Sequence, residues 1–163
     1  MARALLVGCG CHGRELGRSL IGEGWAVRGT SRTAAGAALI EDAGIEPATA
    51  DPDFVGTVLD HVGDVTVAAW LLGSASGTAE QIEAVNRLRL GSLLEKLVDT
   101  PVRGFVFEAA GSAGPDVLAA GAELVERAGR TWMIPVRVVG VERDLEGRWR
   151  EAMTAAIAGV LSG

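Results

Sequence analysis

Residues 3–32 read RALLVGCGCHGRELGRSLIGEGWAVRGTSR, and this stretch decides the fold. It begins with the apolar run of residues 4–7, passes through a glycine-rich turn and continues with apolar residues at helical spacing. A second predicted strand follows at residues 26–30. A strand, a helix and a second strand in this order form a βαβ unit, whose two strands lie parallel. The stretch therefore predicts an α/β fold built on a parallel sheet.

The turn is a G-x-G-x-x-G motif in which each glycine has a separate physical role. Gly8 permits the tight turn out of the strand, Gly10 lets the backbone approach a diphosphate, and Gly13 lets the helix pack closely against the strand. The first helical turn then offers free N–H groups and the positive end of a dipole to phosphates. We interpret this turn as a dinucleotide site rather than as a purely structural glycine turn. Three further residues of the turn are expected beside the cofactor: Cys9, Cys11 and His12.

The end of the second strand indicates which dinucleotide is bound. NAD-binding folds usually place an acidic residue there for the ribose hydroxyls, but residues 26–32 contain no Asp or Glu. Ser31 can donate a hydrogen bond, and Arg32 can hold a phosphate through two N–H groups. NADP is therefore favoured, with NAD as the alternative. Arg28 lies within the strand and is a weaker candidate, and Arg32 could instead be a solvated surface charge.

The remainder of the chain alternates between strand and helix patterns, as a three-layer doubly wound parallel sheet (a Rossmann fold) requires. We expect one NAD(P)-binding domain over residues 1–163. The predicted helices cover residues 33–43, 52–61, 78–99, 115–128 and 144–161, and the further strands cover residues 45–50, 64–71, 102–107 and 131–141.

Charge and hydropathy patterns argue against several other classes of protein. The chain of 163 residues has a formal net charge of −6 and no basic stripe with interleaved aromatics, so no nucleic-acid partner is expected. No apolar run reaches membrane-spanning length, and no membrane partner is expected either. The N-terminal residues enter a strand almost at once without a signal peptide. These features predict a cytoplasmic protein.

The glycine turn and the stretch after it resemble the atypical short-chain dehydrogenase/reductase (SDR) proteins, in the NAD(P)-binding, epimerase-like group with a GCGxxG turn. The likeness is specific over residues 3–32 and looser over residues 50–51, 65–69 and 104–107. It implies that Asp51 contacts the adenine. It also implies that a segment containing Trp70 and Leu71 lines the ribose and nicotinamide side of the cofactor.

Departures from this family are equally informative. The family's proton donor is a Tyr four residues before a Lys, but these 163 residues contain no tyrosine and a single lysine, Lys96. Residues 108–112 carry alanines where the family tends to place Ser or Thr. The chain also ends at Gly163, where such enzymes continue into a region that shapes the substrate pocket. The resemblance therefore implies a C-terminally truncated member without the usual active site.

Two loops of small residues, 73–77 and 109–114, follow strands on the carboxyl side of the predicted sheet. Ligands bind at that side in open α/β folds, and small residues leave room for them. The alternative is that both are ordinary turns, and position and composition do not choose between the two.

Cys9, Cys11 and His12 also form a cluster that invites a metal or redox interpretation. A four-ligand zinc site needs more partners than this sequence supplies, since the only other histidine is His61. We therefore expect no metal site and two free thiols. Because Cys11 would lie at a helix N-terminus, which favours a thiolate, it is the cysteine expected to be sensitive to oxidation.

Two functions remain open at this stage. One is an NADPH-dependent oxidoreductase that passes hydride to a flavin-like or quinone-like acceptor, a reaction in which the cofactor does most of the chemistry. No catalytic residue can be assigned, and the candidate proton donors near the nicotinamide are Glu108, Ser112 and His12. The other is a non-catalytic NADP(H)-binding redox sensor or interaction protein. The expected partners are the dinucleotide and an unidentified small-molecule acceptor, with a homodimer left open.

Overall fold

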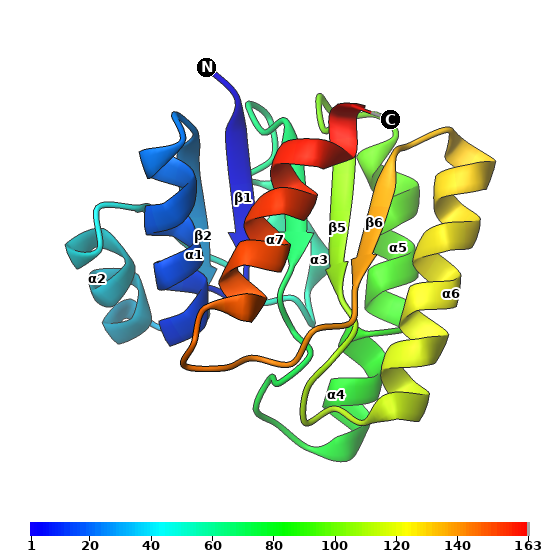
Figure 1. The fold of residues 1–163 in the computed structure, drawn as a ribbon. Coiled ribbons are helices and arrows are strands. Elements are labelled where there is room, and N and C mark those ends of the chain that lie inside the picture. The colour runs from blue at the N-terminus through cyan, green and yellow to red at the C-terminus, as the bar shows by residue number, and fades with distance from the viewer. Residues whose placement is uncertain (163) are drawn as a thin grey trace.

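Six parallel strands form one sheet in the order β3-β2-β1-β4-β5-β6 in the computed structural model, which describes residues 1–162 (Figure 1). The strands are β1 (Arg3–Val7), β2 (Ala26–Ser31), β3 (Glu46–Thr49), β4 (Val67–Trp70), β5 (Gly104–Glu108) and β6 (Val136–Val139). The helices are α1 (Cys11–Gly22), α2 (Ala34–Asp42), α3 (Val55–Leu59), α4 (Ala79–Val85), α5 (Leu88–Leu97), α6 (Pro115–Trp132) and α7 (Arg148–Gly159), followed by the 3-10 turn η1 (Val160–Ser162).

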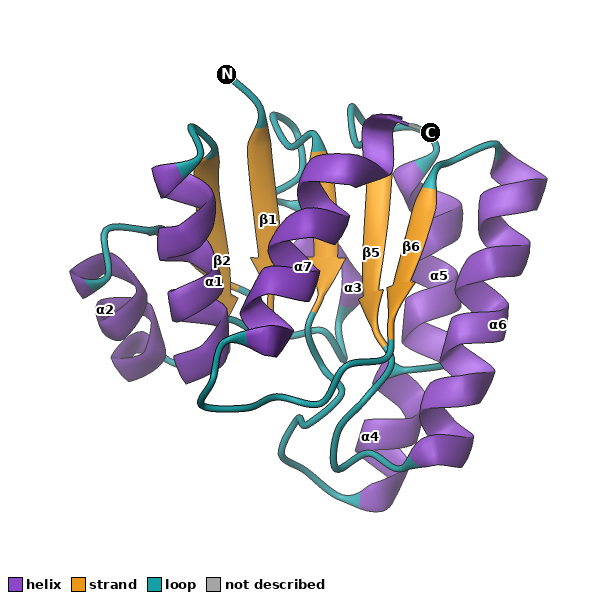
Figure 2. Ribbon diagram, in the orientation of Figure 1, coloured by secondary structure: helices purple, strands orange, loops and turns teal. Residues whose placement is uncertain are grey.

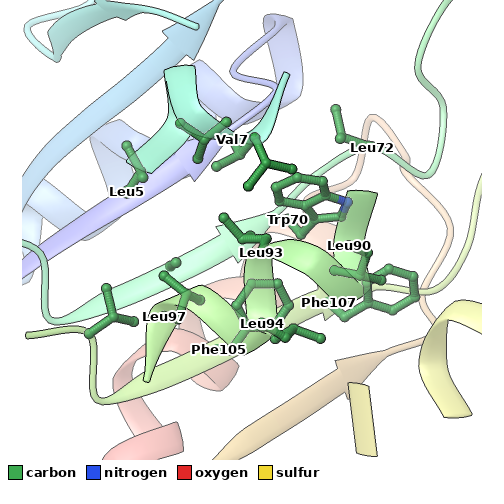
Figure 3. Packing of buried hydrophobic residues seen from close by; sticks show 14 of the residues in the cluster. Leu5, Val7, Trp70, Leu72, Leu90, Leu93, Leu94, Leu97, Phe105 and Phe107 are labelled. Carbon is green, nitrogen blue, oxygen red and sulfur yellow. The ribbon is translucent and has the colours of Figure 1, made fainter. Parts of the chain in front are cut away.

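Helices cover both faces of the sheet, which confirms the predicted three-layer doubly wound fold (Figure 2). Successive side chains of a strand point to opposite faces, so the buried strands supply two cores. Ala4 and Leu6 of β1 pack with α1, α2 and α7, whereas Leu5 and Val7 pack with α3, α4, α5 and α6. Figure 3 shows the second of these cores, in which the largest side chain is Trp70.

The predicted helix over residues 78–99 is wrong in one respect, because it is divided into α4 and α5. The indole Nε1 of Trp70 donates to the carbonyl oxygen of Val85 at 3.0 Å, which a continuous helix would use for its own ladder. The side-chain amide of Asn86 donates to the carbonyl oxygen of Ile82 at 3.0 Å and competes with the backbone in the same way. Arg87 then leaves the helical region, with φ −138° and ψ −84°.

The strand predicted over residues 131–141 is also shorter than expected. The preceding helix continues to Trp132 and ends at Met133, whose φ of 59° lies in the left-handed region. The N–H of Ile134 closes the helix end by donating to the carbonyl oxygen of Gly129 at 3.1 Å. Pairing with β5 therefore starts only at Val136.

The strand order reverses beside β1, which lies between β2 and β4. The connection after β1 enters α1 on one face of the sheet, while the connection after β4 enters α4 on the other. The two connections diverge, and they leave a crevice at the carboxyl ends of the strands, which lie at the bottom of Figure 1. Among residues 1–162, no helix has both the length and the apolar character needed to cross a bilayer.

Candidate functional site

A cavity of about 320 Å³ occupies the crevice at the carboxyl ends of the strands. Its lining comes from the connections after β1, β2, β3, β4 and β6 and from residues of α1, α2 and α4. The charged side chains in the lining are Arg14, Arg32, Asp51, Asp53 and Arg143.

Gly8 makes the sharp turn that was predicted for it. Its φ is +86°, and a Cβ at this position would lie 2.6 Å from Leu72 Cδ2 and 2.8 Å from the carbonyl oxygen of Leu71. Its N–H donates to Thr30 Oγ1 at 3.1 Å, and the N–H of Cys9 donates to the carbonyl oxygen of Thr30 at 3.0 Å. The turn is thus hydrogen-bonded to β2 and lies close against the residues that follow β4, and any side chain at Gly8 would strain it.

Gly10 differs from Gly8, because it lines the cavity and has room. Its φ is −85°, and a Cβ would meet no atom within 4 Å. Gly10 is also the N-cap of α1, and no side chain of the described residues caps that helix. The N–H groups of Cys11, His12 and Gly13 therefore begin the helix without helical partners, beside the open space.

Gly13 is buried, and a Cβ there would lie 3.4 Å from Cys9 Sγ, so its small size serves packing.

The connection after β2 contributes Ser31 and Arg32 to the cavity lining, as expected for a phosphate-binding pair. Ser31 Oγ accepts from the N–H of Thr33 at 3.2 Å, and Thr33 Oγ1 accepts from the N–H of Gly36 at 3.0 Å. Arg32 is exposed, and the ion pairs formed within residues 1–162 do not include it. Its guanidinium is therefore available to an anionic ligand.

Arg28, the weaker candidate, is committed elsewhere. Its two terminal nitrogens bind both oxygens of Asp64 at 2.6 and 3.1 Å, and one of them also pairs with Glu46 at 3.0 Å. The Arg28 guanidinium holds the pKa of Asp64 below its usual range. Arg28 thus ties β2 to its neighbours and lies outside the cavity lining.

Asp51 lines the cavity at the end of β3, where the family resemblance expects an adenine contact. Its Oδ1 accepts from the N–H of Asp53 at 3.0 Å, which is a local turn closed by a side chain. Asp53 itself pairs with Arg89 at 3.1 Å. Oδ2 of Asp51 makes no hydrogen bond within the described residues.

Trp70 is not where the resemblance expects a cofactor contact. Its side chain is fully buried in the core shared with α5 and α6 and is absent from the cavity lining (Figure 3). The reason is register: Val67 and Ala69 face α1 and α7, so Trp70 faces the opposite side of the sheet. Leu71, one residue further on, does line the cavity.

Cys11 lies outside the cavity lining, contrary to expectation, and so does His12. The ring of His12 packs edge-on against Trp149 of α7, with ring centroids 5.9 Å apart.

Glu108 is buried rather than solvated. Arg143 binds it through two parallel hydrogen bonds, Nε to Oε2 at 2.9 Å and Nη2 to Oε1 at 3.0 Å. The same Oε1 accepts from the N–H of Gly73 at 2.9 Å. A carboxylate with these partners holds three segments of the chain together.

The two small-residue loops pack against each other. The N–H of Ala113 donates to the carbonyl oxygen of Gly73 at 2.9 Å, and the N–H of Ser112 donates to Ser74 Oγ at 3.2 Å. A Cβ at Gly111 would overlap the backbone of Gly73. Only the first loop lines the cavity, and small residues in the second permit close packing instead of leaving space for a ligand.

The two cysteines have different environments. Cys9 is buried beneath the turn, where burial raises the pKa of its thiol to about 12, while Cys11 is exposed on α1. The described residues contain no group of three His, Cys, Asp or Glu side chains that could hold a metal ion.

We expect a mild alkylating reagent at pH 8 to modify one cysteine of the native protein and two of the unfolded protein. Cys11 is accessible, whereas Cys9 stays a protonated, covered thiol. Mass spectrometry after proteolysis identifies the modified residue, and the Cys11→Ser variant should not react at all while folded. Equal labelling of Cys9 in the native protein would contradict the buried position.

Among the cationic residues of the cavity lining, sequence reasoning missed two, Arg14 and Arg143. Arg14 directly follows Gly13 on the first turn of α1, so its place in the motif was a usable signal. Arg143 carries no comparable signal, because its position depends on partners far away in the sequence.

No family model and no curated protein sequence matches this chain. Solved structures do match it. A UDP-glucose 4-epimerase from Thermus thermophilus, solved with NAD, has a TM-score of 0.69 at 17% identity over 91% of this chain and 59% of that one. An SDR superfamily protein from Agrobacterium tumefaciens with bound NAD has a TM-score of 0.68 at 20% identity, over 83% and 48%. The UDP-glucose 4-epimerase of Thermotoga maritima has a TM-score of 0.69 at 14% identity, over 83% and 54%.

This chain therefore shares its fold with these epimerases and this SDR protein, as the sequence resemblance implied. At identities this low the likeness establishes the fold alone. The chain spans about half the length of the solved structures it matches.

Proposed function

We propose that this chain binds NADP(H) at the carboxyl edge of its sheet. The observation that supports this most directly is that one cavity is lined by both Gly10, at the uncapped start of α1, and Arg32, at the end of β2. A dinucleotide needs both places, because its diphosphate binds at the helix N-terminus and its adenine ribose lies near the end of the second strand. Neighbours solved with NAD lend the proposal further support.

The preference for NADP over NAD rests on charge at the end of β2. Arg32 has no acidic partner among the described residues, and the segment Ala26–Ser31 carries no carboxylate for the ribose hydroxyls. A free guanidinium suits a 2′-phosphate, which it can bind through two N–H groups. Asp51, which lines the same cavity, is proposed to lie near the adenine.

Isothermal titration should show tighter binding of NADPH than of NADH. Arg32→Ala should reduce the affinity for NADPH by about 1.5–3 kcal/mol, the value of a hydrogen bond to a charged group. The affinity for NADH should change little, because NADH lacks the 2′-phosphate. Arg18→Ala is the matched control, since Arg18 is an exposed arginine of α1 outside the cavity lining. Equal or tighter NADH binding by the unmodified protein would contradict the proposed preference.

The chemistry proposed for this site follows from the positions of its three candidate proton donors. When bound, the cofactor supplies a hydride. Glu108 is committed to Arg143, His12 packs against Trp149, and Ser112 lies outside the cavity lining. We therefore propose that any reaction passes hydride to an acceptor that stabilises its own negative charge, such as a flavin or quinone ring.

A non-catalytic role as an NADP(H) sensor is the second candidate. It is favoured by the packing of the loop after β4 against the loop after β5, because this contact takes up space above the ends of both strands.

An acceptor panel distinguishes these two candidates. NADPH absorbance should fall with flavins or quinones if the protein is an oxidoreductase, and should not change with alcohols, sugars or simple ketones. General acid catalysis typically contributes roughly 10²–10⁴-fold, and Glu108, His12 and Ser112 are not placed to supply it. Binding of NADPH with no turnover of any acceptor would favour the sensor. Rapid reduction of a simple ketone, lost in Ser112→Ala, would show that a proton donor is present after all.

A further inference from the structure

Arg143 is a charged residue of the cavity lining to which the proposed function assigns no role. It lies in the connection between β6 and α7, and its side chain is 20% exposed. Two of its three guanidinium nitrogens are occupied: Nε and Nη2 bind Glu108, and Nη2 also donates to the carbonyl oxygen of Leu71 at 3.2 Å. Nη1 makes no hydrogen bond within residues 1–162, and Arg143 lines the cavity. One amino group of the guanidinium is therefore available to a ligand.

The position of the guanidinium is held from several sides. Glu108 is fully buried, and its two hydrogen bonds fix the plane of the Arg143 guanidinium. The guanidinium also stacks over the ring of Trp149, with Arg143 Cζ 5.1 Å from the ring centroid. Trp149 in turn contacts His12, which belongs to the first turn of α1. Such a side chain loses little conformational freedom when it binds a ligand.

The same contacts place Arg143 beside the glycine turn. The carbonyl oxygen of Leu71, which Nη2 contacts at 3.2 Å, lies only 2.8 Å from the position of a Cβ on Gly8. The guanidinium and the start of α1 therefore border the same part of the cavity from two elements more than a hundred residues apart in sequence.

We infer that Arg143 is a ligand of the dinucleotide diphosphate, and that its Nη1 binds the phosphate on the nicotinamide side. This inference rests on the proposed function. Phosphate is the chemistry that fits, because a guanidinium already neutralised by Glu108 can still offer charge-assisted N–H groups to an anion. In this arrangement Arg32 recognises the 2′-phosphate, while Arg143 recognises the part of the cofactor that NADP and NAD share.

The test measures the affinities of two ligands for the unmodified protein and for a double variant that preserves the local charge balance. Glu108→Gln combined with Arg143→Met removes both partners of the buried pair, so no uncompensated charge remains in the interior. NADPH contains the second phosphate, whereas adenosine 2′,5′-bisphosphate lacks it. The double variant should bind NADPH roughly tenfold to a hundredfold more weakly and the bisphosphate within about twofold of the unmodified protein.

Two further variants make the result specific. Arg148→Met removes an arginine of the same region that pairs with Asp144 and lies outside the cavity lining, and it should bind both ligands normally. Arg143→Lys retains a cation for Glu108 but has no second amino group to offer a phosphate. It should therefore also lower the affinity for NADPH and leave the affinity for the bisphosphate unchanged. It replaces the double variant if circular dichroism shows that the double variant is unfolded.

The outcomes separate the inference from the proposed function. The role of Arg143 is overturned if the folded variants bind NADPH with unchanged affinity. It is also overturned if they lose equal affinity for NADPH and for the bisphosphate. Failure of the unmodified protein to bind either ligand overturns the proposed function itself.

Discussion

Replacing Gly10 with valine is expected to abolish dinucleotide binding and to leave the protein folded. Gly10 has a φ of −85°, which other residues can adopt, and a Cβ would meet no atom within 4 Å. The added side chain would project into the cavity at the start of α1, where the proposed diphosphate needs close contact with the backbone. We expect titration with NADPH to show a loss of roughly a hundredfold or more, equivalent to about 3 kcal/mol.

Two other glycines provide the comparison for this variant. Gly63→Val introduces the same side chain into open space at the other end of the sheet, and should bind NADPH normally. Gly8→Val would strain a residue with φ +86° and collide with Leu71 and Leu72, so it is expected to unfold the protein and cannot report on the ligand. A Gly10→Val variant with a native circular dichroism spectrum and unchanged NADPH affinity would show that the turn is only structural.

Removing the Glu108 side chain should cost a large part of the protein's stability while leaving the backbone of the site unstrained. Glu108→Ala leaves Arg143 without its bidentate partner and the N–H of Gly73 without its acceptor. Breaking a buried ion pair from one side typically costs about 3–5 kcal/mol, and the partial exposure of Arg143 places the expected value near 3 kcal/mol. Urea denaturation followed by circular dichroism measures the change in the free energy of unfolding.

The matched control for this substitution is Glu123→Ala on α6. Glu123 pairs with Arg127 one helical turn away at 3.4 Å, and both side chains are largely exposed, so its removal should leave the unfolding transition nearly unchanged. Similar denaturation midpoints for Glu108→Ala and the unmodified protein would show that the buried pair does not stabilise this fold.

Local patterns in the sequence were sufficient for the sheet and for its glycine turn. The apolar run before Gly8, the spacing of apolar residues in α1 and the strand and helix alternation all depend on contiguous residues, and the structure reproduces them. The presence of Arg32 in the cavity lining was also predictable, because it directly follows a strand whose carboxyl end borders the crevice.

The orientation of Trp70 could not be predicted in the same way. Residues 67–72 are uniformly apolar, as expected for a strand buried on both faces, so the sequence contains no alternation that would show which way each side chain points. The pairing of β4 with β1 and β5 decides this, and it turns the indole into the core.

The sequence by itself determined the βαβ unit, the glycine turn and the position of Arg32, because short-range periodicity and glycine geometry are properties of neighbouring residues. Only the tertiary structure decided that Glu108 is a buried partner of Arg143 and that Arg143 reaches Leu71. These pairs lie 35 and 72 residues apart in the chain. Their contact depends on strand order and on the path of the β6–α7 connection across the carboxyl edge, and side-chain contacts of that range exist only after the strands have assembled into the sheet.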